Sequence, residues 1–271
     1  MCIKEYNKGR ESMNILNRYT LITGGTEGIG LEIAKLFAIN KHNLIIVAKN
    51  KNKLENIKIK FEEEYKIIVE IIQIDLCVDK SCKKIIKIVE EKNFVVDNLI
   101  NNAGIGSFGL FSEAEDGFEE NLININIIAL TTLTKYFLKD MIKRGEGGIL
   151  NVASTAAFIG GPKMSMYYSS KAYVLSLTEA LHDEVKKLGI RVSCLCPGPV
   201  KTSFQERAGI NKSEKAKKYL MDASKVAEEA YLGLIKGKAI IVPGYKNKLL
   251  TLGNKLISRA LSRKIILKSN S

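Results

Sequence analysis

Short, continuously apolar segments alternate with helical segments along most of the 271-residue chain. Strands that are apolar on both faces are typical of a parallel sheet covered by helices on both sides. Strand–helix alternation throughout predicts a Rossmann-like, doubly wound α/β fold of about seven strands in one domain. The expected strands are residues 19–23, 43–48, 67–75, 96–101, 147–154, 190–196 and 239–244, and the expected helices are residues 29–40, 53–65, 81–92, 121–143 and 166–188. Ser81 is expected to cap the third of these helices at its N-terminus, and Gly189 to close the fifth.

Three parts of the chain differ in composition. Residues 1–18 are polar and aperiodic, and they are expected to form a flexible leader. Residues 19–244 carry the strand–helix alternation and are expected to form the Rossmann-fold domain. Residues 245–271 form a basic, amphipathic tail. The chain contains no Pro/Gly/Ser-rich linker and no internal repeat, which favours a single folded domain.

The positive charge of the chain is concentrated at its C-terminal end. The net charge is +13, and nine of these charges lie beyond Glu229, where no acidic residue occurs. The tail could pack on the main domain or on a dimer partner. It could also lie on an anionic membrane as an interfacial helix. Nucleic acid is not an expected partner, because the tail offers no aromatic platform on which bases could stack.

Two further observations bear on location and metal binding. The chain has no run of 18 or more apolar residues, and its start has no apolar signal-peptide core. The five cysteines are odd in number and match no zinc-ligand spacing, so no metal site is expected. These features predict a cytoplasmic protein, with membrane association through the tail as the alternative.

A glycine-rich turn, TGGTEGIG, occupies residues 23–30 between the first expected strand and the first expected helix. Glycine lets the chain turn sharply and lets a ligand approach the backbone. A helix N-terminus offers free N–H groups and a positive dipole to an anion. Gly24, Gly28 and Gly30 are spaced differently from the commoner G-x-G-x-x-G pattern. At this place in a doubly wound sheet the turn predicts binding of a dinucleotide pyrophosphate; a simple tight turn is the alternative.

The ends of the second and third strands bear on which nicotinamide cofactor is bound. A carboxylate after the second strand would accept from the ribose 2′-OH and repel a 2′-phosphate. Lys49 and Asn50 stand there instead, and a lysine can pair with the 2′-phosphate. This pattern favours NADP(H), with NAD(H) as the alternative, although Glu27 inside the turn weakens the case slightly. Asp75 is a candidate to hold the adenine amino group or, alternatively, to cap the next helix.

A serine, a tyrosine and a lysine follow the fifth strand in a pattern that suits proton transfer. Tyr167 and Lys171 are four residues apart and therefore share a helix face. The pKa of tyrosine is ordinarily near ~10, and a nearby ammonium is expected to lower it toward working pH. The hydroxyl of Ser154, at the end of the fifth strand, could polarise a carbonyl.

The motifs TGGTEGIG, NNAG, NVAS, YYSSK and CPGPVKT, in this order, resemble those of the short-chain dehydrogenases/reductases, in particular the single-domain branch. The resemblance covers about residues 19–244. It implies that Tyr167, rather than Tyr168, is the catalytic acid–base and that Ser154 orients the substrate oxygen. It also implies that Lys171 lowers the tyrosine pKa and holds the nicotinamide ribose. Asn126 would hold a water of the proton relay, with Asn124 as the alternative.

The resemblance also implies a set of cofactor contacts. Asn102, Ala103 and Gly104 would line the adenosine ribose side, whereas Pro197, Gly198, Val200 and Thr202 would surround the nicotinamide carboxamide and a phosphate. The complete expected set is Gly24, Thr26, Glu27, Gly28, Ile29, Gly30, Lys49, Asn50, Asp75, Leu76, Asn102, Ala103, Gly104, Tyr167, Lys171, Pro197, Gly198, Val200 and Thr202.

The activity implied is NADP(H)-dependent interconversion of a carbonyl and an alcohol by hydride transfer. A catalytically idle nucleotide-binding scaffold, or a membrane-surface protein that keeps the fold, is the alternative. The segment after Thr202 is expected to form a substrate flap, with an apolar wall from Phe204, Ala208, Ile210 and Leu220. The loop 105–117 is expected to add Phe108, Leu110 and Phe111. The resemblance further implies a homo-oligomer, dimer or tetramer, formed through helices 121–143 and 166–188.

Overall fold

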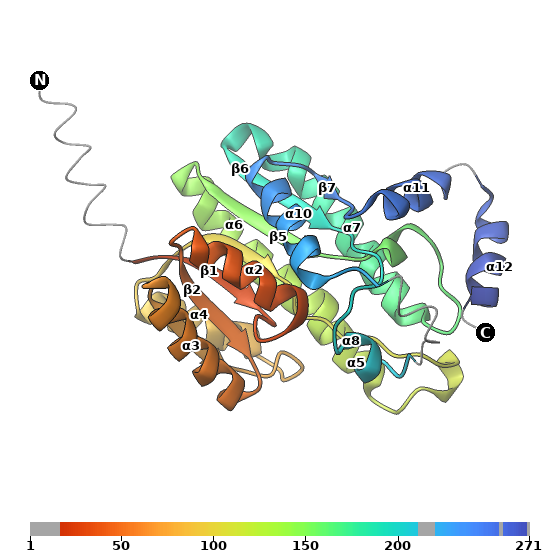
Figure 1. Cartoon of the computed structure of the whole chain (residues 1–271), viewed down its shortest axis with the longest axis horizontal. Coiled ribbons are helices and arrows are strands. Elements are labelled where there is room, and N and C mark those ends of the chain that lie inside the picture. Colours follow the sequence, from red (N-terminus) through yellow and green to blue (C-terminus); the bar gives the residue numbers. More distant parts are fainter. Residues whose placement is uncertain (1–16, 211–219, 255–256, 270–271) are drawn as a thin grey trace, which may run out of the picture.

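The computed structural model of the chain describes residues 17–210, 220–254 and 257–269 (Figure 1). Seven strands in this described part form one sheet in the order β3-β2-β1-β4-β5-β6-β7, and every neighbouring pair is parallel. The strands are β1 (Arg18–Thr23), β2 (Asn43–Ala48), β3 (Val69–Gln73), β4 (Val95–Asn101), β5 (Gly147–Val152), β6 (Ile190–Leu195) and β7 (Ile240–Ile241). The strand order reverses between β1 and β4, and a doubly wound sheet binds its ligand at such a point.

Helices cover both faces of the sheet, as the apolar strands predicted. α2 (Gly28–Ile39), α3 (Lys51–Tyr65) and α10 (Ala223–Ile235) pack on one face, and α4 (Ser81–Glu91), α6 (Leu130–Arg144) and α7 (Ser165–Val185) pack on the other. Successive strand residues point to opposite faces. In β1, for example, Leu21 belongs to the core under α4 and α6, whereas Ile22 belongs to the core under α2 and α10. The expected fold class is therefore confirmed.

Several local expectations are corrected by the structure. Ser81 is the first residue of α4 rather than its cap, because Lys80 occupies the cap position in the left-handed region with φ +60° and its side chain makes no capping bond. Asp75 is not a helix cap either, because its carboxylate accepts from the N–H of Cys77 at 2.9 Å, ahead of α4. Gly189 does end its helical segment at φ +82°, as expected, after a short 3-10 turn.

The expected helix 121–143 is longer and is interrupted. It consists of α5 (Phe118–Ile123), a π-helical turn η3 (Asn124–Ala129) and then α6. A π turn inserts one extra residue into a helix and often marks a functional position. Here it contains Asn126, which is 1% exposed.

The structure describes both ends of the main sheet domain and part of the tail. β1 begins at Arg18, one residue before the expected strand, and the Arg18 guanidinium pairs with Asp97 at 2.7 Å. The rest of the expected leader, residues 1–16, lies outside the described residues. The tail forms α11 (Tyr245–Gly253) and α12 (Arg259–Ser269), which lie beside the C-terminal end of the sheet (Figure 1). No helix in the described part of the chain is both long and apolar enough to cross a bilayer.

Candidate active site

The glycine-rich turn forms a close contact between two loops at the point where the strand order reverses. The Asn102 side chain, after β4, donates to the carbonyl oxygens of Thr23 and Gly24 at 3.1 and 2.9 Å. A Cβ on Gly30 would lie 2.3 Å from Asn102 Nδ2 and 2.4 Å from the Gly24 oxygen, so only glycine fits there. Gly24 and Gly28 adopt φ values of +65° and +57°, which glycine tolerates best.

The start of α2 is suited to an anion. Glu27 is its N-cap residue, but the Glu27 side chain makes no bond to the first N–H groups of the helix. These donors are therefore available, together with the positive end of the helix dipole, on the side lined by the turn. The close glycine packing and the uncapped helix fit a dinucleotide pyrophosphate.

A single cavity of about 1300 Å³ runs from this turn along the carboxyl ends of the strands. Every expected cofactor residue except Gly30 lines it, and Gly30 lies in the turn behind it. Ser154, Tyr167 and Lys171 line the same cavity. The structure thus brings together residues that are up to about 180 positions apart in the sequence. In the described part of the chain, no group of three or more His, Cys, Asp or Glu side chains is placed to hold a metal ion.

Glu27 is held by cations that the sequence did not single out. Lys53, in the first turn of α3, pairs with one carboxylate oxygen at 2.8 Å, and Arg207 and Ser203 bond the other. Burial alone would raise the pKa of Glu27, but hydrogen bonds from Lys53, Arg207 and Ser203 lower it to about 2. The negative charge at this position is therefore compensated. The sequence could have indicated Lys53, because it lies three residues after Asn50, the residue that caps α3 at the cofactor end of β2. Nothing in the sequence indicates that Arg207 contacts Glu27.

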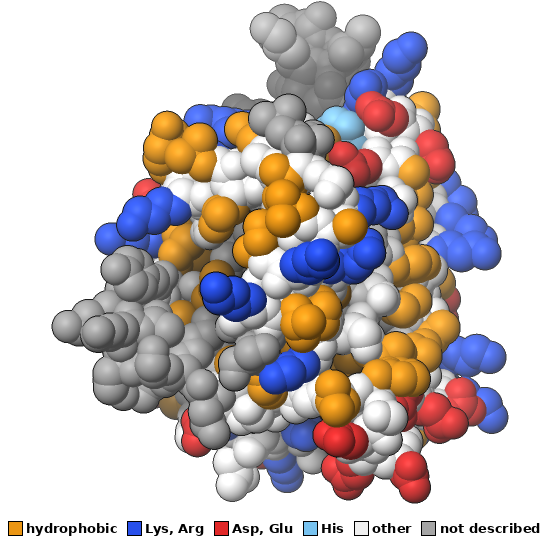
Figure 2. Space-filling model, turned by 90° about the vertical axis from the view of Figure 1, so that its right-hand side faces the viewer, with side chains coloured by type: hydrophobic (Ala, Val, Ile, Leu, Met, Phe, Trp, Pro, Cys, Tyr) orange, Lys and Arg blue, Asp and Glu red, His pale blue; other side chains and the backbone are white. Residues whose placement is uncertain are grey.

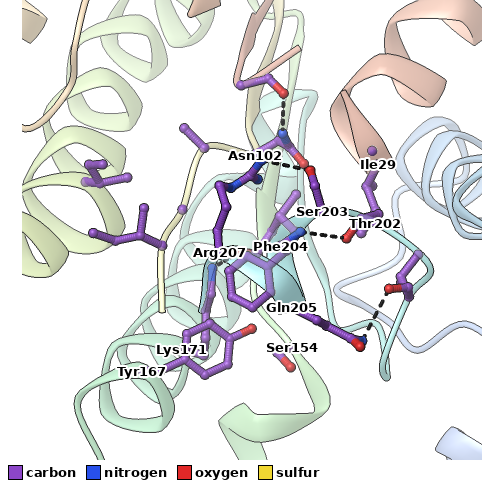
Figure 3. Close-up of a pocket in the computed structure, with 18 of the residues that line it drawn as sticks. Ile29, Asn102, Ser154, Tyr167, Lys171, Thr202, Ser203, Phe204, Gln205 and Arg207 are labelled. Carbon is purple, nitrogen blue, oxygen red and sulfur yellow. Dashed lines mark hydrogen bonds between the residues drawn. The ribbon is translucent and has the colours of Figure 1, made fainter. Parts of the chain in front are cut away.

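The three candidate catalytic side chains meet at the other end of the cavity (Figure 3). Ser154 follows β5 by two residues and caps the 3-10 turn Thr155–Phe158, and Tyr167 and Lys171 lie on α7. The Lys171 ammonium donates to the Val152 carbonyl at 2.8 Å and lies 5.7 Å from the centre of the Tyr167 ring. The Phe204 ring, from the flap, packs against Tyr167 at 5.4 Å. These contacts orient the tyrosine hydroxyl toward Ser154 and the cavity (Figure 3).

The expected lowering of the Tyr167 pKa is contradicted by the structure. Burial raises this pKa to about 12, while the hydrogen-bonding side chain of Ser154 acts in the opposite direction. Burial also lowers the pKa of Lys171, to about 8. Desolvation disfavours the charged form of both groups, so a phenolate is not stabilised by the neighbouring lysine alone. The arrangement is suited to a neutral phenol that donates a proton.

Asn126, rather than Asn124, lies beside these groups. Its side chain accepts from the Ile105 N–H at 3.0 Å and donates to the Ile105 carbonyl at 2.9 Å. A Cβ on Gly104 would lie 3.2 Å from Asn126 Oδ1 and 3.3 Å from Lys171 Nζ, so these groups converge. Asn124 instead donates to the Cys77 carbonyl. The π turn presents Asn126 to the site.

The expected apolar walls are present only in part. Phe204, Ile210 and Phe108 line the cavity. Leu110 and Phe111 do not, and both are exposed. Ala208 is buried and Leu220 is half-buried, and neither of them lines the cavity. Residues 211–219 of the flap lie outside the described part of the chain. Two tail residues that the sequence did not indicate, Leu250 and Ile266, complete the wall.

These features define a dinucleotide-binding protein of the doubly wound α/β class, and comparisons with known proteins specify the family. The family model of the short chain dehydrogenases matches residues 18–213. The chain therefore belongs to the short-chain dehydrogenase/reductase family of NAD(P)-dependent oxidoreductases, as its motifs predicted.

Three relatives illustrate the similarity. A very-long-chain 3-oxoacyl-CoA reductase-like protein of Arabidopsis thaliana is 34% identical over 206 residues, which are 73% of this chain and 65% of that protein. A short-chain dehydrogenase from Sphingobium yanoikuyae in complex with NADPH has a TM-score of 0.79 at 29% identity, covering 88% of this chain and 93% of that one. The bulky-bulky ketone specific alcohol dehydrogenase from Comamonas testosteroni has a TM-score of 0.75 at 27% identity, covering 91% and 96%.

Proposed function

We propose that this protein is an NADP(H)-dependent carbonyl reductase. It reduces an apolar ketone or aldehyde to the alcohol and catalyses the reverse oxidation of that alcohol. The observation that carries the proposal is one cavity with the glycine-rich turn at one end and Ser154, Tyr167 and Lys171 at the other. When bound, the nicotinamide supplies the hydride.

The residues of the chain supply position and a proton. The Tyr167 hydroxyl donates its proton to the oxygen of the carbonyl as that oxygen gains negative charge. Ser154 donates a hydrogen bond to the same oxygen and orients it. Tyr167 is a neutral phenol at neutral pH and therefore carries the proton to be donated, although burial, by raising its pKa to about 12, makes it a weaker acid than an exposed tyrosine. Lys171, whose ammonium lies 5.7 Å from the centre of the Tyr167 ring, would hold the nicotinamide ribose. Asn126 would hold a water behind Lys171, through which a proton from solvent would restore the Tyr167 phenol.

The balance of charge near the adenosine end supports NADP(H). Lys49, Lys53 and Arg207 all line the cavity there, and the Glu27 carboxylate is already paired with two of them. A 2′-phosphate carries additional negative charge and finds Lys49 at the end of β2, where a carboxylate would repel it. Asp75 lines the cavity at the end of β3 and remains the proposed partner of the adenine amino group.

Replacing Lys49 by Asp is expected to lower the ratio of kcat/KM for NADPH over NADH by about 10-fold or more, because it exchanges attraction of the 2′-phosphate for repulsion. The ratio is measured with one carbonyl substrate and both cofactors. Lys60→Asp, an equal charge change at an exposed position of α3 away from the cavity, is the control and leaves the ratio as it is. An unchanged ratio in Lys49→Asp would contradict the role of Lys49.

The walls of the cavity support an apolar substrate. Phe108, Met164, Phe204 and Ile210 line the cavity, and the Phe204 ring packs against Tyr167. The names of two relatives point the same way: one is a very-long-chain 3-oxoacyl-CoA reductase-like protein and another is specific for bulky-bulky ketones.

A panel of carbonyl compounds of increasing chain length, assayed by oxidation of NADPH and of NADH, tests the activity. We expect turnover with NADPH and a kcat/KM that rises with the apolar length of the substrate, because each added buried CH₂ contributes about 0.8 kcal/mol. Cofactor binding without turnover on any member of the panel would favour the catalytically idle scaffold instead.

Two broader features complete the proposal. A homo-oligomer through helices 121–143 and 166–188 is supported by exposed side chains on these segments, Ile128 of η3 and Tyr173 of α7 among them. A cytoplasmic location is supported by Cys77, Cys82, Cys194 and Cys196, which are free thiols as expected in a reducing compartment.

A further inference from the structure

The tail helix α11 has its apolar residues on the outside. Thr251 is 7% exposed and Asn247 is half-buried, and both face the domain. Asn247 donates to the Pro243 carbonyl at 2.8 Å and lies against Gly198, where a Cβ would be 2.5 Å from it. Leu249 and Leu252, in contrast, are 50% and 58% exposed. Polar side chains thus face the domain, whereas Leu249 and Leu252 face away from it.

The helix α12 repeats the same inversion. Ser262 is 3% exposed, whereas Leu261 and Ile265, four residues apart on one face, are 49% and 52% exposed. A helix that packed on its own domain would bury these apolar residues and expose the serine. Packing of the tail on its own domain, one of the interpretations that the sequence left open, therefore leaves the apolar faces of both helices uncovered.

The same surface carries basic residues and no acidic ones. We call residues 245–254 and 257–268 the tail surface. It contains Lys246, Lys248, Arg259, Arg263, Lys264 and Lys268, and no Asp or Glu. On the face of the molecule seen in Figure 2, hydrophobic and basic side chains are interleaved over the centre, and acidic side chains lie near the edges. Exposed leucines among lysines and arginines are the pattern of a helix that lies in a membrane interface.

We propose that the tail surface docks on an anionic lipid bilayer. Its leucines and isoleucines enter the boundary of the acyl chains, and its lysines and arginines face the anionic headgroups. Charge complementarity distinguishes this occupant from a second copy of the tail surface. Lys248 pairs with Glu229 of α10 at 3.6 Å, but two tail surfaces face to face would still bring together two predominantly cationic arrays.

Docking would place the opening of the active-site cavity at the lipid. Leu250, on α11, is 65% exposed and also lines the cavity, and Ile266 lines it from α12. An apolar ketone dissolved in the bilayer would therefore reach Tyr167 past the tail helices. This supply of substrate rests on the reductase activity proposed above, whereas the docking itself does not.

Co-sedimentation of the full chain with vesicles tests the docking. The vesicles consist of phosphatidylcholine alone, or of phosphatidylcholine with a quarter of phosphatidylglycerol. We expect the partition coefficient to be at least about 10-fold higher on the anionic vesicles, and to fall at high salt, because several cations approach the surface.

Two variants separate the charged and the apolar contributions. Lys264→Glu with Lys268→Glu is expected to lower binding to anionic vesicles about 10-fold or more. The control is Lys83→Glu with Lys84→Glu, an equal charge change on exposed positions of α4, which lies at the other end of the molecule from α12 in Figure 1. This control is expected to bind as the unchanged chain does. Leu252→Ser with Ile265→Ser keeps the charge and removes apolar contact, and it is also expected to weaken binding.

The outcomes distinguish the proposal from its alternatives. Equal binding to neutral and anionic vesicles, or no binding to either, would overturn the docking. If the chain binds no vesicles, and Leu252→Ser with Ile265→Ser dissociates an oligomer in sedimentation velocity, the tail surface is a contact between copies of the chain. Tyr167→Phe is expected to bind vesicles like the unchanged chain, so failure of the proposed activity would leave the docking result intact. Circular dichroism of each variant checks that it is folded.

Discussion

Replacing Tyr167 by Phe is expected to lower kcat about 10²- to 10⁴-fold, because it removes the proton donor that we assign to the developing alkoxide. Burial holds the pKa of this hydroxyl at about 12, so it stays protonated across the neutral range and is available for donation. The ring of the substituted residue can keep its contact with Phe204, and the glycine-rich turn is not touched. The affinity for NADPH, measured by fluorescence titration, is therefore expected to change little.

Tyr173→Phe is the matched control for this change. It removes a hydroxyl from the same helix, α7, but this hydroxyl contacts Thr131 at 2.9 Å and does not line the cavity. We expect its kcat to remain within about twofold of the unchanged chain, since it lies far from the reacting atoms. Full activity in Tyr167→Phe would refute the assignment of the acid–base, whereas loss of both turnover and NADPH affinity would indicate a structural role.

Replacing Gly30 by Ala is expected to weaken NADPH binding about 10-fold or more. The added Cβ would meet both Asn102 Nδ2 and the Gly24 carbonyl oxygen at less than 2.5 Å, and the second of these is backbone that cannot rotate away. To relieve this clash, the glycine-rich turn must move away from the loop after β4. That movement displaces the N–H groups that would face the pyrophosphate. Overpacking of this kind costs about 1–3 kcal/mol of unfolding free energy.

The affinity and the stability of the Gly30→Ala variant are measured separately, by NADPH titration and by urea unfolding. Gly253→Ala is the control, because a Cβ on Gly253, at the end of α11, has nothing within 4 Å and its φ is not positive. It is expected to leave both quantities within error of the unchanged chain. Unaltered NADPH affinity in Gly30→Ala would show that the turn does not carry the cofactor.

The local expectations that failed did so where the neighbouring chain decides the conformation. Ser81 is a good capping residue by type, but the left-handed conformation of Lys80 places it inside α4. The pair Tyr167 and Lys171 was expected to produce a tyrosine with a lowered pKa. Helical spacing does bring the two together, but the pKa depends on how much solvent each side chain loses, and the surrounding flap and strands determine that.

The linear order of residues was sufficient for the fold class, for the family and for most of the cavity. Apolar strands and helical periodicity are local properties, and the motifs of the glycine-rich turn and of Tyr167 with Lys171 stay close together along the chain. Contacts between distant segments depended on the tertiary structure. Only the packed chain shows that Arg207 and Lys53 hold Glu27, that a π turn presents Asn126, and that the tail helices turn their leucines outward beside the cavity. Sequence alone showed that the tail is basic and amphipathic. Which face of each tail helix is covered depends on how the helix packs against the main domain, and that packing is a tertiary contact.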